Sequence, residues 1–286
     1  MTGETTLVGL LGDPVSRSLS PRMQNAAFAA RGLDWAYVPL RVPSARLEDA
    51  VAGLVALGFA GANVTIPHKT AVIAFCDELD EVAERAGSVN TLVVRDGRVL
   101  ASSSDGPAVV GLVEAAGASA LVLGAGGAAQ AVATALLDAD ARELNVAARD
   151  PERAHALAAR LKTLFPDRAV GAEEAWPPSR GADLLVNATP LREELPMAPS
   201  AGQQIVDLAY NPDGRPTALV AAASEAGCER VVDGIDVLLA QGAVSFERWT
   251  GIAAPVDVMR AALGRASEGP AEAGPSLGSL GPPYGK

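Results

Sequence analysis

The clearest structural signal in this 286-residue chain is the segment Ala120-Leu121-Val122-Leu123-Gly124-Ala125-Gly126-Gly127-Ala128-Ala129. Residues 120–123 are typical of a buried strand and residues 128–137 of a helix, so the glycines form a tight loop between them. Between a strand and a helix, the pattern G-x-G-x-x-G/A indicates dinucleotide binding, because the first glycine permits the turn and the second lets the backbone approach a pyrophosphate. The N-terminus of the helix supplies N–H groups and positive potential. We therefore predict a dinucleotide-binding loop formed by Gly124, Ala125, Gly126, Gly127 and Ala128.

The residues after the next predicted strand, 144–148, indicate which dinucleotide binds. A site for NAD usually has an acidic residue there for the ribose 2′-hydroxyl, whereas a site for NADP has an arginine for the 2′-phosphate. Here Arg149 ends the strand and Arg153 follows one helical turn later, so both can face one phosphate. Asp150 lies between them. The sequence favours NADP and leaves NAD possible; the alternative is that both arginines are ordinary surface residues at the start of a helix.

Strands and helices alternate along the whole chain, which is typical of βαβ units with a mainly parallel sheet. In the first half we predict strands at 6–11, 35–42, 61–65, 89–94 and 99–102, and helices at 20–31, 44–57 and 71–86, the last broken near 76–77. In the second half we predict strands at 120–123, 144–148, 184–187, 205–208 and 230–232, and helices at 105–116, 128–137, 152–161, 216–226, 234–249 and 256–263.

The pair Asp96-Gly97 predicts a hairpin turn that closes a first domain. We therefore predict an α/β fold with two domains and a cleft between them. An α/β substrate domain with a mainly parallel sheet comprises residues 1–104 and 236–265, and a Rossmann-like dinucleotide-binding domain comprises residues 105–235. Residues 266–286 are rich in Gly, Pro and Ser, which predicts a disordered tail.

Composition restricts the function classes. The net charge of −11 argues against nucleic-acid or anionic-membrane partners. Two distant cysteines, Cys76 and Cys228, do not form a disulfide framework, and two histidines give no visible metal site. The N-terminus shows no basic region followed by a long apolar run, so we expect no secretory signal. Glycines divide the apolar run 118–137, so we expect a strand and a helix there rather than a membrane span. We expect a soluble, cytoplasmic protein, monomeric or homodimeric, whose partner is a small-molecule substrate.

The segment Asn63-Val64-Thr65-Ile66-Pro67-His68-Lys69 places Thr65 and Lys69 at the carboxyl end of a strand, where open α/β sheets bind ligands. The chain has three lysines and twenty arginines, so a lysine in a structured turn suggests acid–base chemistry that arginine cannot perform. A solvated surface lysine is the alternative. Other polar residues at predicted strand ends would suit a small polyhydroxylated acid, although each serine alone is also a common cap: Ser18, Ser20, Asn90 and Asp105.

Several independent motifs in one order are more specific than any single motif. On this basis the chain resembles the shikimate dehydrogenase family over about residues 6–263. The matching segments are S-x-S-P at 18–21, N-V-T-x-P-x-K at 63–69, A/S-x-N-T at 88–91, G-A-G-G-A at 124–128, N-A-T at 187–189, D-x-x-Y at 207–210 and D-G-x-x-x-L-x-x-Q at 233–241.

The resemblance implies NADP-dependent, reversible reduction of 3-dehydroshikimate to shikimate, a step of chorismate and aromatic amino acid biosynthesis. It implies that Lys69 and Asp105 form the catalytic pair, and that Thr189 and Gly234 bind the cofactor together with the glycine loop. His68 occupies a variable position of the motif, so we assign it no catalytic role. The implied substrate ligands are Ser18, Ser20, Thr65, Asn90, Tyr210 and Gln241.

The chain departs from the family pattern at five places. These are Gln24 for a frequent histidine, Ser103-Ser104 for N-T, Ala148-Arg149-Asp150 for N-R-T, Arg192 for glycine and Asp236-Val237 for G-M. The departures keep two alternatives open. One is a quinate/shikimate dehydrogenase that uses NAD, and the other is a catalytically idle paralogue that binds NADP(H) or shikimate.

Overall fold

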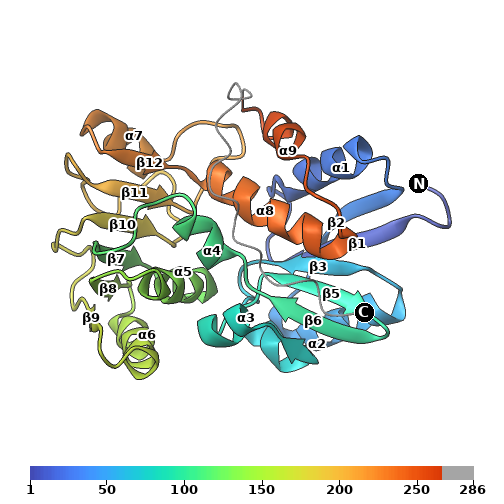
Figure 1. Cartoon of the computed structure of the whole chain (residues 1–286), viewed down its shortest axis with the longest axis horizontal. Coiled ribbons are helices and arrows are strands. Elements are labelled where there is room, and N and C mark those ends of the chain that lie inside the picture. Colours follow the sequence, from blue (N-terminus) through green and yellow to red (C-terminus); the bar gives the residue numbers. More distant parts are fainter. Residues whose placement is uncertain (266–286) are drawn as a thin grey trace.

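The computed structural model describes residues 1–265 and contains two six-stranded sheets, each formed by one half of the chain (Figure 1). The first sheet has the order β2-β1-β3-β5-β6-β4 and the second the order β12-β11-β10-β7-β8-β9. The predicted α/β class is therefore correct. The predicted tail, residues 266–286, lies outside the described residues.

The first sheet is mixed. β1 pairs in parallel with β2 and β3, β5 is antiparallel to β3 and β6, and β4 is parallel to β6. The predicted turn between β5 and β6 is present, and both Asp96 and Gly97 have positive φ angles, 52° and 74°. The strands are β1 Thr6–Gly12, β2 Trp35–Arg41, β3 Gly61–Val64, β4 Glu78–Leu79, β5 Thr91–Arg95 and β6 Arg98–Ser102.

Helices cover both faces of this sheet, so its central strands are apolar on both sides. In β1, Leu10 packs in a cluster with Met23 and Phe28, while the next residue, Leu11, packs in another cluster with Leu54 and Val72. This alternation follows from the two-residue period of a strand. The helices of this half are α1 Ser20–Ala30, α2 Leu47–Ala56 and α3 Glu81–Ala86, with 3₁₀ turns at Ser44–Arg46 and Ala71–Phe75.

The second sheet is parallel throughout. Its strand order reverses between β7 and β10, so the loops after these strands border the crevice in which open α/β sheets bind ligands. The strands are β7 Ser119–Leu123, β8 Glu143–Ala147, β9 Ala169–Ala172, β10 Leu184–Asn187, β11 Gln204–Asp207 and β12 Arg230–Val232. The helices are α4 Asp105–Val110, α5 Gly127–Asp138, α6 Pro151–Leu164 and α7 Ala218–Glu225.

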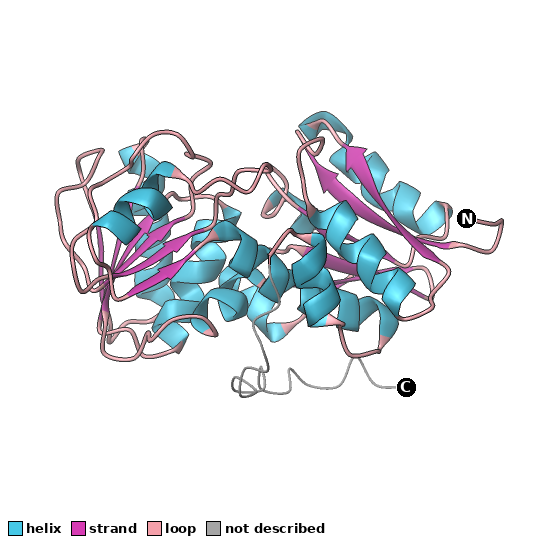
Figure 2. Ribbon diagram, turned by 90° about the horizontal axis from the view of Figure 1, so that it is seen from above, coloured by secondary structure: helices cyan, strands magenta, loops and turns pink. Residues whose placement is uncertain are grey.

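Two closing helices, α8 Gly234–Thr250 and α9 Val256–Ala262, return the chain to the first sheet. Ile235, Leu239 and Phe246 of α8 share an apolar cluster with Met23 and Phe28 of α1. In Figure 1, α8 runs from the second sheet toward the first, and Figure 2 shows the sheets on opposite sides with helices between them. α8 therefore joins the two halves of the molecule.

Some predicted elements are wrong in detail. Residues 71–86 form a 3₁₀ turn, β4 and α3 rather than one broken helix, because Asp77 exchanges hydrogen bonds with Val99 and draws the segment into the sheet. β9 is an additional strand that the sequence does not predict, and the helix at 105–116 ends at Val110. Ser20 is the first residue of α1 instead of its N-cap, since Leu19 occupies that position without a side-chain cap.

The apolar run 118–137 forms β7, the glycine loop and most of α5, as predicted. Within residues 1–265, no helix is both long and apolar enough to span a membrane.

Candidate active site

Lys69 and Asp105 come together between the two halves of the chain. Lys69 follows β3 in the proline-containing loop, and Asp105 is the first residue of α4. Lys69 Nζ lies 2.5 Å from Asp105 Oδ2, and their side chains are 15% and 7% exposed. Burying an ion pair costs desolvation free energy, so such a pair is weak evidence for stability.

Asn90 holds the aspartate in place. Its Nδ2 donates to Asp105 Oδ1 and to Ser104 Oγ at 2.9 Å each, and it lies 3.3 Å from Gln241 Oε1. The Ser104 N–H donates to Asn90 Oδ1 at 2.9 Å, which fixes the amide orientation. The structure thus brings together four predicted site residues: Lys69 from a loop, Asp105 from α4, Asn90 from the position before β5 and Gln241 from α8.

A second group of predicted residues surrounds the loop before α1. Ser18 Oγ donates to Ser20 Oγ at 3.2 Å, and the Leu19 N–H donates to the Tyr210 hydroxyl at 3.3 Å. Tyr210 follows β11, so a residue of the second half touches this loop of the first half. Thr65 is half-buried next to Gly12, where an added Cβ would lie 2.4 Å from Thr65 Cγ2.

A buried network that the motifs do not predict connects the two groups. Tyr37 of β2 donates to Asn63 Oδ1 at 2.9 Å and is hydrogen-bonded to Ser20. Burial raises the pKa of Tyr37, so this phenol stays protonated and remains a donor. Asn63 Nδ2 donates to the Asn90 carbonyl and to Ser245 Oγ, both at 2.9 Å. Only the position of Asn63 at the end of a buried strand could have indicated this network from sequence.

The glycine loop has the geometry of a dinucleotide site. Gly124 has a φ of 110°, and a Cβ there would lie 3.0 Å from the Ala188 carbonyl oxygen, so glycine is required. α5 begins at Gly127, one residue earlier than predicted, with neither a side-chain cap nor an acidic residue in its first turn. Its N-terminal N–H groups therefore fit a pyrophosphate.

Arg149 and Arg153 are exposed at the start of α6, and neither is ion-paired with any of residues 1–265. Asp150, which lies between them, accepts a hydrogen bond from the Glu152 N–H at 3.1 Å and caps α6. The Asp150 carboxylate therefore caps the helix, while the guanidinium groups of Arg149 and Arg153 can bind a phosphate.

The other predicted cofactor residues lie at neighbouring strand ends. Thr189 follows β10, and its N–H and hydroxyl donate to Asn187 Oδ1 at 3.0 and 2.6 Å. Gly234 is the first residue of α8, and a Cβ there would lie 2.4 Å from the Ala209 carbonyl oxygen. Both positions border the crevice at the carboxyl ends of the second sheet.

Three further residues have structural contacts. The His68 ring is buried, with Nε2 2.7 Å from the Val42 carbonyl oxygen. Gln24, which stands in place of a frequent histidine, donates a hydrogen bond to the Gly242 carbonyl at 2.8 Å. Ser104, in the segment where the family has N-T, accepts a hydrogen bond from Asn90. Ser103 Oγ is buried without a hydrogen-bond partner in the described part of the chain.

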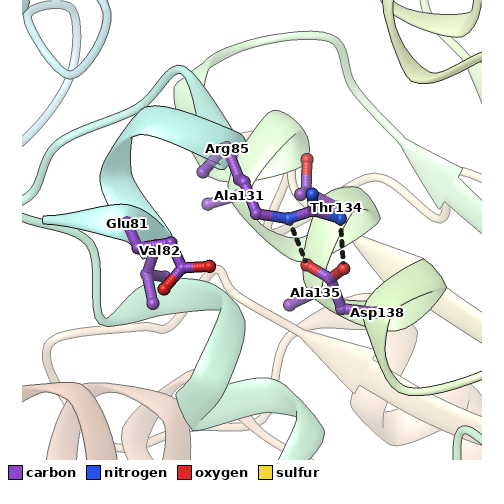
Figure 3. Close-up of a pocket in the computed structure, with 8 residues that line it drawn as sticks. Glu81, Val82, Arg85, Ala131, Thr134, Ala135 and Asp138 are labelled. Carbon is purple, nitrogen blue, oxygen red and sulfur yellow. Dashed lines mark hydrogen bonds and ion pairs between the residues drawn. The ribbon is translucent and has the colours of Figure 1, made fainter. Parts of the chain in front are cut away.

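A cavity of about 380 Å³, which neither Lys69 nor Asp105 lines, lies between α3 and α5 (Figure 3). Arg85 of α3 reaches across it to Asp138 of α5, with Arg85 Nη2 2.5 Å from Asp138 Oδ1. Arg160 of α6 also donates to the Arg85 carbonyl at 2.6 Å. These contacts tie α3, in the first half of the chain, to α5 and α6 in the second.

The fold and the site define a class, the two-domain α/β oxidoreductases that use a pyridine dinucleotide. Residues 10–92 match the shikimate dehydrogenase substrate binding domain, residues 109–176 match shikimate/quinate 5-dehydrogenase, and residues 234–263 match the shikimate 5′-dehydrogenase C-terminal domain. The chain belongs to the shikimate dehydrogenase family, which confirms the resemblance inferred from the motifs.

Curated relatives and solved structures agree over almost the whole chain. A shikimate dehydrogenase (NADP(+)) of Rubrobacter xylanophilus is 48% identical over 283 residues, which covers 91% of this chain and 96% of the relative. A shikimate dehydrogenase (NADP(+)) of Moorella thermoacetica is 46% identical over 288 residues, which covers 93% of this chain and 97% of the relative. Shikimate 5-dehydrogenase from Thermus thermophilus, solved in complex with NADP(H) and shikimate, is 33% identical in sequence. Its structure superposes with a TM-score of 0.78 and covers 90% of this chain and 98% of its own.

Proposed function

We propose that this chain catalyses the reversible, NADP-dependent reduction of 3-dehydroshikimate to shikimate. The observation that carries the proposal is the Lys69–Asp105 ion pair, buried beside Asn90 and Gln241 and next to the start of α5. The names of the relatives, shikimate dehydrogenase (NADP(+)), support the same reaction and cofactor.

In the proposed mechanism, the glycine loop 124–128 and Arg149 would hold NADPH, which would supply the hydride for the ketone carbon of the substrate. Lys69, as the ammonium, donates a proton to the ketone oxygen as negative charge develops there. Asp105 accepts a hydrogen bond from Lys69 and so aims the ammonium, while Asn90 fixes the second carboxylate oxygen. In the reverse direction the neutral amine of Lys69 takes the proton of the hydroxyl.

We assign substrate binding to the hydroxyl and amide groups around this pair. Ser18, Ser20 and Tyr210 form one side, and Asn90 and Gln241 the other, with Thr65 at the end of β3. Their donors and acceptors suit a small acid that carries several hydroxyls. The hydrogen bonds of Tyr37 with Asn63, and of Asn63 with the Asn90 carbonyl, connect the two sides.

The proposed domains follow the two sheets. Residues 1–104 and 236–265 form the substrate domain, and residues 105–235 form the NADP-binding domain. The cofactor ligands would be the glycine loop 124–128, Thr189, Gly234, and Arg149 with Arg153 at the 2′-phosphate. We further propose that the chain acts as a monomer or homodimer, which light scattering of the purified protein would distinguish.

The decisive experiment is steady-state oxidation of shikimate and of quinate, each with NADP and with NAD, followed through the absorbance of the reduced nicotinamide. We expect the highest kcat/KM for shikimate with NADP. A higher value for quinate with NAD would identify the other enzyme of this family, and tight NADPH binding without turnover would identify a catalytically idle protein.

A further inference from the structure

Asp207 ends β11 with a fully buried side chain that lies outside the proton-transfer pair. Its carboxylate accepts hydrogen bonds from three different segments of the chain. Asn187 Nδ2 and the Ala209 N–H each lie 2.9 Å from Oδ1, and Thr217 Oγ1 lies 2.5 Å from Oδ2. A carboxylate has acceptor sites for all three donors at once, which few other side chains offer.

The first of these contacts leads to the loop after β10, which contains the proposed cofactor ligand Thr189. Asn187 Oδ1 accepts from both the N–H and the hydroxyl of Thr189, and the Leu191 N–H donates to Thr189 Oγ1 at 3.3 Å. The same loop passes directly over the dinucleotide loop, since a Cβ on Gly124 would lie 3.0 Å from the Ala188 carbonyl oxygen. Through Asn187, Asp207 therefore fixes the position of the loop 188–191.

The second contact leads to the substrate side. Asp207 binds the Ala209 N–H, and the Ala209 carbonyl packs against Gly234 at the start of α8, where a Cβ would lie 2.4 Å away. The next residue, Tyr210, accepts from the Leu19 N–H between the two serines of the substrate loop. Asp207 thus also fixes the segment 208–210.

Burial makes an acid costly at this position. It raises the pKa of Asp207 to about 6, although three hydrogen bonds and the nearby Arg192 charge favour the ionised form. An apolar side chain of similar size would avoid the desolvation cost of the carboxylate but would leave Asn187, Ala209 and Thr217 without an acceptor. The carboxylate is therefore explained by the donors that it satisfies and by the loops that it orients through them.

We propose that Asp207 is a positioning residue, whose single carboxylate holds the Thr189 loop and the Tyr210 segment in the arrangement that cofactor and substrate require. This inference rests on the proposed function. Asp207 touches neither ligand itself and acts through Asn187 and Ala209.

Three variants of the full chain test the proposal: Asp207→Ala, Asp207→Asn and the control Leu219→Ala. Leu219 is a buried residue of α7 that packs in an apolar cluster of the same domain with Leu185 and Ile205, so it reports loss of packing alone. Equilibrium NADPH binding, measured by fluorescence, and kcat are compared at a temperature at which all variants are folded. We expect Asp207→Ala to weaken NADPH binding and to lower kcat by about ten- to a hundredfold, since small misplacements of binding groups are costly.

Asp207→Asn keeps an acceptor for Asn187 and Ala209 and can donate to Thr217, so we expect it to restore both quantities to within about threefold of the wild type. Equal behaviour of Asp207→Ala and Leu219→Ala in both measurements would overturn the proposal. If Asp207→Ala does not fold, Asn187→Ala replaces it, and unchanged binding and kcat in that folded variant would also overturn it. If the wild type fails to oxidise shikimate, the proposed function fails, while NADPH binding still tests the role of Asp207.

Discussion

Lys69 Cβ lies 2.6 Å from the position that a Cβ atom on residue 127 would take. Gly127 is the first residue of the dinucleotide helix α5, and Lys69 belongs to the loop after β3 of the other sheet. The absence of a side chain at residue 127 therefore lets the helix N-terminus approach the lysine. This contact places the predicted pyrophosphate site next to the predicted proton donor.

We expect Gly127→Ala to lower kcat for shikimate oxidation by about ten- to a hundredfold, because the new methyl group must displace the Lys69 backbone or α5. The matched control is Gly53→Ala in α2, where an added Cβ meets no atom within 4 Å. Steady-state kinetics with saturating NADP and shikimate measure the effect. A Gly127→Ala enzyme as fast as the control would show that the close approach is not required.

The features that could be predicted from sequence are those with local signals. The G-A-G-G-A loop, the Asp96-Gly97 turn and the apolar strands depend on neighbouring residues, so their patterns are visible in the chain. β4 and β9 have no such signal, because their pairing partners, β6 and β8, determine them more than their own short sequences do.

In the candidate active site, too, only the features with local sequence signals could be predicted. Motifs predict Lys69 and Asp105, but the network of Tyr37, Asn63 and Ser245 depends on contacts between residues far apart in sequence. Tyr37 lies in a strand where an aromatic residue is expected for packing alone, so nothing in its local sequence indicates a buried hydrogen bond.

Lys69→Ala should fold and bind NADPH but lose most turnover. General acid–base groups contribute about 10²- to 10⁴-fold to rate, so we expect a loss of this order in kcat. The control is Lys162→Ala, which removes an exposed lysine of α6. Rapid-mixing and fluorescence measurements separate turnover from NADPH binding. Near-normal kcat in Lys69→Ala would exclude the proposed proton transfer.

Arg149→Ala should reduce the preference for NADP over NAD. A hydrogen bond between charged groups contributes about 1.5–3 kcal/mol, which corresponds to a decrease of about ten- to a hundredfold in the ratio of kcat/KM for NADP to that for NAD. Arg31→Ala, an exposed arginine after α1, is the control for general charge effects. If both variants keep the wild-type ratio, Arg149 does not bind the 2′-phosphate.

Asp207 also predicts how stability depends on pH. Burial raises its pKa from 3.8 to about 6, so the folded protein binds a proton more tightly than the unfolded chain, and the stability from this proton is present below about pH 4 and lost as pH rises through 6. The difference in unfolding free energy, wild type minus Asp207→Asn, should therefore fall by about 2 kcal/mol between pH 4 and 7. Urea unfolding of both proteins at several pH values measures this difference.

The surface control is Asp213→Asn. Here the difference in unfolding free energy, wild type minus variant, should rise with pH, because Arg215 lowers the pKa of Asp213. A difference that stays constant or rises for Asp207→Asn would mean that the folded protein does not hold this proton.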